Sequence, residues 1–85
     1  MSELAERVSG LVETLVLPLV EHKEELEVTA TEDTAGVIYV DIACNEADTG
    51  KIIGRQGRAI KAVRTLARAV VPASSKTRVE VELID

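Results

Sequence analysis

The stretch Ile52-Ile53-Gly54-Arg55-Gln56-Gly57-Arg58-Ala59-Ile60-Lys61-Ala62-Val63 decides the fold of this chain. Two glycines frame a basic and a polar residue, Arg55 and Gln56, and isoleucines stand on both sides of this turn. Gly54 suits the C-terminus of one helix, where a positive φ is needed. A second helix is expected over residues 57–71, because a proline follows directly. The stretch therefore predicts two helices joined by a short loop with a glycine at each end.

Positive charge gathers around this loop, although the chain as a whole carries a formal net charge of −5. No acidic residue lies between Lys51 and Arg78, a segment that holds most of the basic side chains. At about 100° per residue, Arg58, Lys61, Arg64 and Arg68 share an arc of about 120° on the second helix. A cationic surface of this kind can bind an anion even when the whole protein is acidic.

The remainder of the chain predicts a single α+β domain spanning residues 1–85, with the order α-β-β-α-α-β. The expected elements are helices over 3–16, 46–53 and 57–71 and strands over 26–31, 37–44 and 77–84. Ser2 and Asn45 are the expected N-caps of the first two helices. A short turn makes the first two strands antiparallel, whereas the two-helix crossover makes the last strand parallel to its predecessor. We therefore expect a mixed three-stranded sheet with helices covering one face.

Composition excludes several classes of protein. Cys44 is the only cysteine, so an intramolecular disulfide and a cysteine-based zinc cluster are ruled out. The first ten residues lack the pattern of a signal peptide, and no apolar run approaches about 20 residues. Tyr39 is the only aromatic residue, so base stacking on aromatic side chains cannot be a main binding mode. These features predict a cytoplasmic protein without a membrane segment.

The chain shows no constellation of catalytic residues. Gly50-Lys51 suggests a phosphate loop, but Asn45 stands where the first glycine should be and Ile52 where Ser or Thr should be. His22 lies in an acidic segment and is expected to be solvated. Cys44 is expected to be a small packing residue, and a nearby helix N-terminus that lowers its thiol pKa is the alternative. We predict no enzyme, no cofactor, no metal and no small-molecule substrate.

The stretch 52–63 resembles the I-I-G-x-x-G-x-x-I signature of KH domains. Length and element order are most similar to the small bacterial single-KH proteins of the KhpA family. The resemblance implies a type II-like KH fold over the whole chain, with a GxxG loop that clamps about four nucleotides. It also implies a cytoplasmic RNA-binding protein with an RNA chaperone role. Members of this group are associated with a second KH protein, KhpB (also called Jag), and with cell-envelope homeostasis, which includes cell shape and cell-wall organisation.

The predicted site follows from the loop and its basic neighbours. The expected RNA-binding residues are Gly54, Arg55, Gln56, Gly57, Arg58, Lys51, Lys61 and Ile53. We expect the groove to lie between the 46–53 helix, the loop and the 37–44 strand, with aliphatic side chains such as Ile53 and Ile60 holding bases or serving as core. Arg68, Lys76 and Arg78 are expected to be mainly solvated charge. The acidic balance predicts modest affinity that falls steeply with salt, and two joined copies would recover affinity.

Two alternatives stay open. Single-stranded DNA is a possible ligand, because no residue is identifiable as reading a 2′-OH. The domain could also be an interaction module with little RNA binding of its own, because the helix over 57–71 has a wider apolar arc than packing on a sheet requires. Such a module would form a homodimer or a heterodimer with a larger KH-containing partner.

Overall fold

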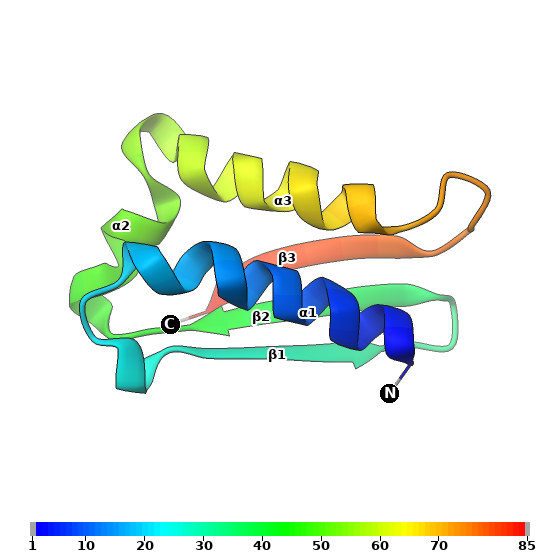
Figure 1. The fold of residues 1–85 in the computed structure, drawn as a ribbon, viewed down its shortest axis with the longest axis horizontal. Helices are drawn as coiled ribbons and strands as arrows, with labels where there is room; N and C mark the ends of the chain where they lie inside the picture. The colour runs from blue at the N-terminus through cyan, green and yellow to red at the C-terminus, as the bar shows by residue number, and fades with distance from the viewer. Residues whose placement is uncertain (1, 85) are drawn as a thin grey trace.

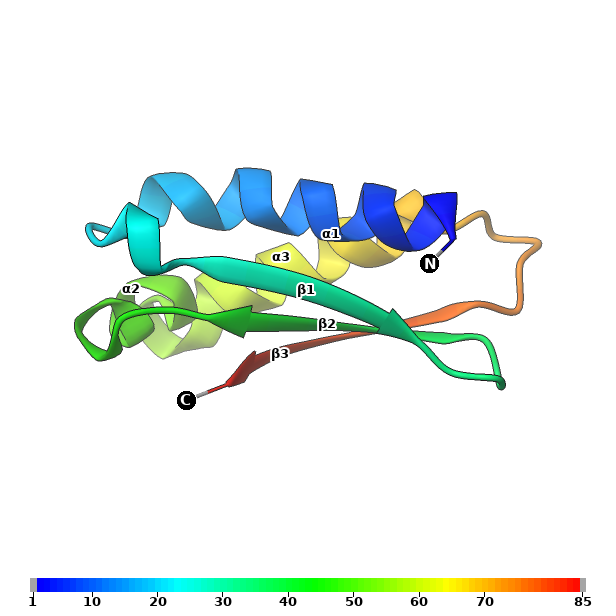
Figure 2. The ribbon, with the colours of Figure 1, turned by 90° about the horizontal axis from the view of Figure 1, so that it is seen from below.

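The computed structural model describes residues 2–84, and its elements follow the predicted order (Figure 1). The helices are α1 (Glu3–Val16), α2 (Thr49–Ile53) and α3 (Arg58–Val70), and the strands are β1 (Glu27–Glu32), β2 (Val37–Ala43) and β3 (Arg78–Ile84). Figure 2 shows α1 and α3 lying over one face of the sheet, while the opposite face carries no helix within residues 2–84. The predicted α+β fold is confirmed.

The sheet has the order β1-β2-β3, so β2 is the central strand and β3 is an edge strand. β1 pairs with β2 antiparallel, and β2 pairs with β3 parallel. In that parallel register Ile38 faces Val79 and Val40 faces Val81, which places buried side chains side by side on the helix-covered face. The predicted mixed sheet is therefore correct in both of its pairings.

The helices are fixed on the sheet by apolar rows at helical spacing. Val8, Val12 and Val16 of α1 are completely buried, and α3 contributes Ile60, Val63 and Ala67 to the same core. Complete burial of one such aliphatic side chain stabilises the fold by about 1.5–3 kcal/mol. This packing sets the position of α3 and, with it, the position of the loop that precedes α3.

One predicted helix is wrong in detail. The segment 46–53 is not a single helix but a 3₁₀ turn over Glu46–Asp48 followed by the short α2. Asn45 caps the turn as predicted, since its side chain accepts a hydrogen bond of 2.8 Å from the backbone N–H of Ala47. The tighter turn accompanies the complete burial of Asp48, which lies under the domain surface and does not face solvent. The remaining boundaries differ from the predicted ones by about one residue.

Candidate nucleic-acid interface

The loop between α2 and α3 has an unusual backbone that depends on its glycines. Gly54 has φ 77° and ψ 171°, Gly57 has φ 74° and ψ 14°, and Gln56 also has a positive φ of 58°. A Cβ added at Gly54 would lie 2.6 Å from the Cβ of Ala59, whereas one at Gly57 would meet open space. Gly54 is therefore required for close packing as well as for its conformation. Together these dihedral angles turn the chain sharply from α2 into α3.

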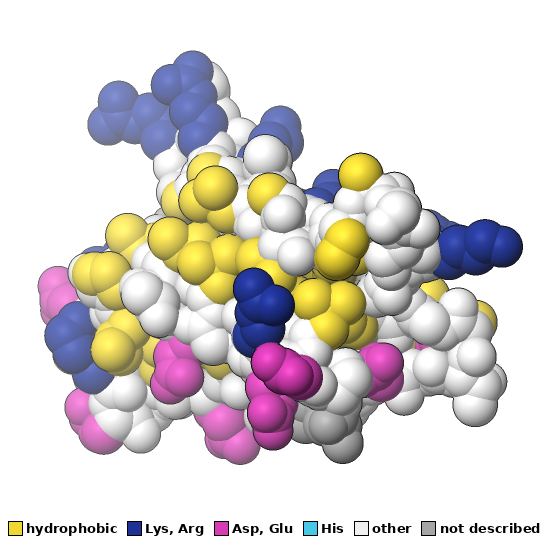
Figure 3. Space-filling model, turned by 45° about the vertical axis from the view of Figure 1, so that its right-hand side comes forward, with side chains coloured by type: hydrophobic (Ala, Val, Ile, Leu, Met, Phe, Trp, Pro, Cys, Tyr) yellow, Lys and Arg dark blue, Asp and Glu magenta, His cyan; other side chains and the backbone are white. Residues whose placement is uncertain are grey.

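The loop side chains leave their polar groups accessible. Arg55, Gln56 and Arg58 are exposed, and an Arg58 Nη donates a hydrogen bond of 3.1 Å to Oε1 of Gln56. Within residues 2–84 neither arginine forms an ion pair. Gly57 provides no side-chain cap for α3, so the first-turn N–H groups of α3 have no side-chain acceptor. Figure 3 shows basic side chains gathered on the projecting tip formed by this part of the chain.

A hollow of about 560 Å³ lies beside the loop. It is lined by residues of α2, α3 and β3: Thr49, Ile53, Ile60, Arg64, Glu82 and Leu83. Ile53 is 38% exposed at its rim, whereas Ile60 is 7% exposed and belongs largely to the core. The predicted groove wall, the 37–44 strand, is wrong, because β2 is the central strand and β3 lies outside it next to α3. We call this space the loop hollow.

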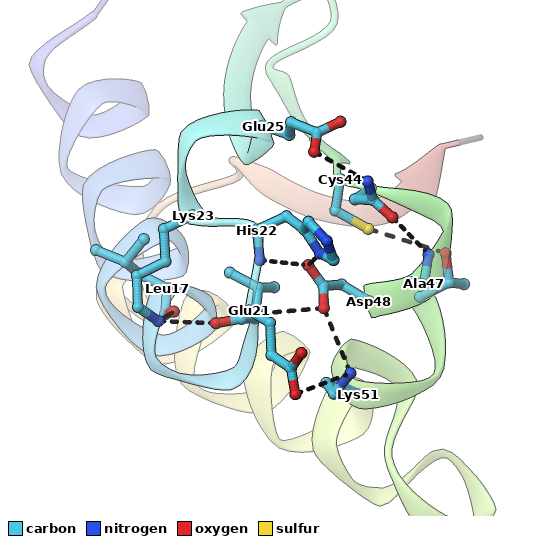
Figure 4. A network of polar contacts seen from close by, with 12 residues as sticks. Leu17, Glu21, His22, Lys23, Glu25, Cys44, Ala47, Asp48 and Lys51 are labelled. Atoms are coloured by element: carbon cyan, nitrogen blue, oxygen red, sulfur yellow. Dashed lines mark hydrogen bonds and ion pairs between the residues drawn. The ribbon is translucent and has the colours of Figure 1, made fainter.

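Lys51 does not join the arginines of the loop. Its Nζ lies 3.7 Å from a carboxylate oxygen of Glu21 and 3.5 Å from one of Asp48. The side chain is thereby drawn toward the segment between α1 and β1 (Figure 4). Its contact with RNA stays a prediction, and its present neighbours neutralise much of its charge.

Asp48 is the most important residue whose structural role was not predicted from the sequence. Its buried carboxylate accepts hydrogen bonds from the backbone N–H groups of Glu21 (3.1 Å) and His22 (2.9 Å), and Nδ1 of His22 lies 3.2 Å away (Figure 4). Burial by itself would raise the pKa of Asp48, but the donated bonds of His22 and Glu21 outweigh it and lower the pKa to about 2. Asp48 thus fixes the α1–β1 connection to the start of α2.

Two single residues have clear structural roles near this network. His22, predicted to be solvated, is only partly exposed and contacts Asp48. Cys44, predicted to be a packing residue, is partly buried against the core, with its Sγ 3.9 Å from Oγ1 of Thr49. Within residues 2–84 no cluster of His, Cys, Asp and Glu has a geometry suited to a metal ion. No helix in this part of the chain is long and apolar enough to cross a membrane.

The sides of α3 differ in chemistry. Lys61 is exposed, Nε of Arg64 donates to the carbonyl oxygen of Val81 at 3.2 Å, and Nε of Arg68 donates to that of Val79 at 3.4 Å. This basic side faces β3. Elsewhere on the helix Leu66 is 47% exposed, and Figure 3 shows apolar side chains spread over the face that presents the helices. The cationic arc predicted for this helix therefore includes two arginines that are anchored on the edge strand.

Known proteins of similar sequence and fold identify the family. A family model described as the KH domain of KhpA/KhpB matches residues 9–83. RNA-binding protein KhpA of Bacillus subtilis is 38% identical over 80 residues, covering 94% of this chain and 96% of that protein. RNA-binding protein KhpA of Listeria monocytogenes is 36% identical over 75 residues, covering 88% and 96%.

A crystal structure of an Aquifex aeolicus Era variant bound to GDP and aluminium fluoride matches the fold. Its TM-score is 0.61 at 19% sequence identity, and the match covers 98% of this chain and 31% of that longer one. At this identity the likeness concerns the fold alone. The family model and the KhpA relatives, in contrast, extend over nearly the whole sequence and include the glycine-framed loop. The chain therefore belongs to the KhpA/KhpB family of KH domains.

Proposed function

We propose that this protein binds single-stranded RNA through the Gly54–Gly57 loop and the loop hollow. The observation that carries the proposal is the juxtaposition, at the N-terminus of α3, of arginines that form no ion pair within residues 2–84 with a hollow lined by both apolar and polar side chains. The naming of the KhpA relatives as RNA-binding proteins supports it.

The backbone of the strand would lie against the loop. Phosphate oxygens accept hydrogen bonds from first-turn N–H groups of α3 other than that of Arg58, which already donates to the carbonyl oxygen of Arg55. The positive end of the helix dipole adds attraction there. Arg55 and Arg58 pair with neighbouring phosphates, and Gln56 donates to phosphate or sugar oxygens. Since Gly57 carries no Cβ and open space surrounds that position, the strand can approach the main chain closely there.

The bases would enter the loop hollow. Ile53 at its rim and Leu83 on β3 provide apolar contact, and Thr49 and Glu82 offer groups that hydrogen-bond base edges. Stacking on an aromatic ring is not part of this mechanism, because Tyr39 bonds to Asp33 and is not among the residues that line the hollow. Base recognition then depends on aliphatic contact and polar groups in the groove.

The test is a double variant, Arg55→Asp with Gln56→Asp, titrated with short single-stranded RNA at several salt concentrations. A matched control, Arg7→Asp with Thr34→Asp, adds the same negative charge at exposed sites outside the loop and the hollow. We expect RNA binding that weakens with salt in the wild type and the control and is lost in the loop variant, with circular dichroism showing that all three are folded. Equal binding by the loop variant and the control would refute the loop mechanism.

We further propose that binding gives RNA chaperone activity in the cytoplasm, since a segment held on the loop cannot pair with another strand. Annealing of two complementary RNAs measures this directly. The wild type should change the annealing rate, and the loop variant should leave the rate at its protein-free value. An identical effect of both proteins would separate any chaperone activity from the loop.

A second candidate function is supported by Leu66, whose side chain is 47% exposed on α3. We propose that this apolar surface binds a second copy or a larger KH-containing partner of the KhpB/Jag type, which would link the protein to cell-envelope homeostasis. Leu66→Asp should convert a dimer to a monomer in sedimentation analysis while the affinity for a short RNA changes little. A wild type that is monomeric with and without that partner would refute this role.

A further inference from the structure

Two further hollows lie beyond the loop hollow along the line where α3 meets β3. The loop hollow shares Arg64 and Glu82 with a second hollow of about 530 Å³, and that one shares Arg68 and Glu80 with a third of about 420 Å³. The third hollow reaches the connection over residues 71–77. We call the three together the α3–β3 furrow. Its lining residues on α3 run from Ile60 to Arg68. α3 lies beside β3 (Figure 1) and, at 1.5 Å per residue, is about 20 Å long.

The furrow is cationic in a protein that is acidic overall. Its walls carry four cations, Lys61, Arg64, Arg68 and Arg78, against two carboxylates, Glu80 and Glu82. Glu80 is itself neutralised in part, since its oxygens lie 3.9 Å from Arg68 and 3.7 Å from Arg78. A groove lined mainly by one sign of charge concentrates the opposite charge within it.

Two arginines in the furrow are held in place before any ligand arrives. Arg64 and Arg68 are four residues apart on α3, a rise of about 6 Å. Their acceptors, the carbonyl oxygens of Val81 and Val79, are two residues apart on β3, a rise of about 6.6 Å. The two spacings match, so each Nε can bond to successive outward carbonyls of the edge strand.

This arrangement leaves donors for a ligand. The Nη groups of Arg64 form no hydrogen bond or ion pair within residues 2–84. A guanidinium fixed through Nε keeps its remaining N–H groups for an anion and loses less side-chain freedom on binding. Arg68, one helical turn further along the furrow, keeps Nη1 as a donor, since only its Nη2 lies near Glu80.

We infer that the α3–β3 furrow extends the RNA site beyond the loop hollow, so that one copy holds a strand longer than four nucleotides. This inference rests on the proposed function. The strand leaves the loop and follows α3 toward residues 71–77, with Lys61, Arg64, Arg68 and Arg78 on its phosphates. A furrow of about 20 Å accommodates on the order of four to six further nucleotides at 3.4 Å or more each.

A protein strand fits the furrow less well than RNA does. A peptide that added to the edge strand would need the outward carbonyls of Val79 and Val81 as hydrogen-bond acceptors. Arg64 and Arg68 already occupy these acceptors, an arrangement that also protects the edge from aggregation. An anionic ligand needs no bond to the strand and uses the free sides of the same arginines.

The experiment compares an RNA of four nucleotides with one of about nine on the intact protein. The furrow variant is Arg68→Gln with Arg78→Gln, because neither residue lines the loop hollow. The matched control, Thr14→Asp with Thr34→Asp, changes the net charge equally at exposed sites away from the furrow. A longer RNA offers several overlapping four-nucleotide sites, which by itself raises its apparent affinity. We expect the wild type and the control to bind the longer RNA more tightly than this statistical factor explains, and we call the excess the length gain.

In the furrow variant we expect this length gain to shrink while affinity for the four-nucleotide RNA is retained. Two lost phosphate contacts reduce the slope of log affinity against log salt by about 1.4, which is about a sevenfold change over a fourfold salt range. Glu80→Gln should act in the opposite direction and strengthen binding of the longer RNA.

Three results would overturn the inference. One is a furrow variant that keeps the whole length gain, and another is a wild type with no length gain at all. The third is a variant that loses self-association but no RNA affinity, which would assign the furrow to a protein strand. Absence of binding to both RNAs, even by the wild type, would instead refute the proposed function on which this inference depends.

Discussion

Gly54 and Gly57 are both glycines of one loop, yet the structure predicts that replacing them by alanine has different consequences. Gly57 has a left-handed conformation with open space around its missing Cβ. Alanine in that conformation costs about 1–2 kcal/mol. Gly54 has φ 77° and ψ 171°, a region that is almost restricted to glycine and costs other residues about 1–3 kcal/mol.

Gly54→Ala would add a steric cost to the backbone cost. Its Cβ would lie 2.6 Å from the Cβ of Ala59 and 2.8 Å from the backbone nitrogen of Ala59. The two methyl carbons would have to separate by 0.8 Å to reach 3.4 Å, the start of ordinary van der Waals contact. Overpacking of this kind costs about 1–3 kcal/mol. We therefore expect Gly54→Ala to lower the free energy of unfolding by about 2–6 kcal/mol, against about 1–2 kcal/mol for Gly57→Ala.

Urea unfolding followed by circular dichroism measures both values, with the slope m showing whether the transition stays two-state. A double-mutant cycle with Ala59→Gly isolates the contact, because that change removes the Cβ but keeps the backbone nitrogen. Part of the loss in Gly54→Ala should then be recovered, with an interaction energy of about 0.5–3 kcal/mol. Equal destabilisation by the two alanine substitutions, or no recovery in the cycle, would show that packing against Ala59 is not what requires Gly54.

Further predictions concern the core, the hydrogen bonds of Asp48 and the basic residues near the loop. Ile52→Ala should lower the free energy of unfolding by about 2–5 kcal/mol in urea titrations, because its side chain is completely buried beside the loop. The pKa of Asp48 is lowered from 3.8 to about 2, so the ionised carboxylate stabilises the fold above about pH 4, and this contribution is lost as the pH falls toward 2. Asp48→Asn should therefore flatten a plot of unfolding free energy against pH between about pH 4 and pH 2. An unchanged plot would show that ionisation of Asp48 does not stabilise the fold. Lys51→Gln should weaken RNA binding less than Arg58→Gln in parallel titrations, since Lys51 is engaged with carboxylates; the reverse order would place Lys51 on the RNA.

The local features of the fold could be predicted because they depend on neighbouring residues. The helix expected over 3–16 coincides with α1, since its apolar spacing, the Ser2 cap and the following proline all act within a few residues. The positive φ of Gly54 was likewise predictable from its place at a helix end. The alternation of apolar and polar residues predicted the strands and indicated which side of each strand is buried.

Features that depend on distant segments could not be predicted in the same way. The groove was expected against the 37–44 strand, but β3 pairs outside β2 and takes that place beside α3. Nothing within the strand 37–44 encodes which strand lies nearest the loop. Asp48 accepts bonds from residues 26 and 27 positions earlier in the chain, so a helix-start acid gave no signal of burial. Asp48 stands among polar residues, Asn45, Glu46 and Thr49, and nothing local distinguishes it from a solvated acid.

The separation of chemistry around α3 explains how an acidic protein can still present a cationic surface, on which the proposed RNA site lies. One side of the helix packs on the core through Ile60, Val63 and Ala67, which fixes its orientation. The basic side is then held toward β3, where backbone carbonyls orient two of its arginines. Most carboxylates lie elsewhere in the sequence, and screening at physiological salt limits their repulsion to about 8 Å. Both the repulsion by these carboxylates and the attraction by the basic residues of the loop and furrow therefore act over short distances. This favours binding of a strand already in contact over long-range capture.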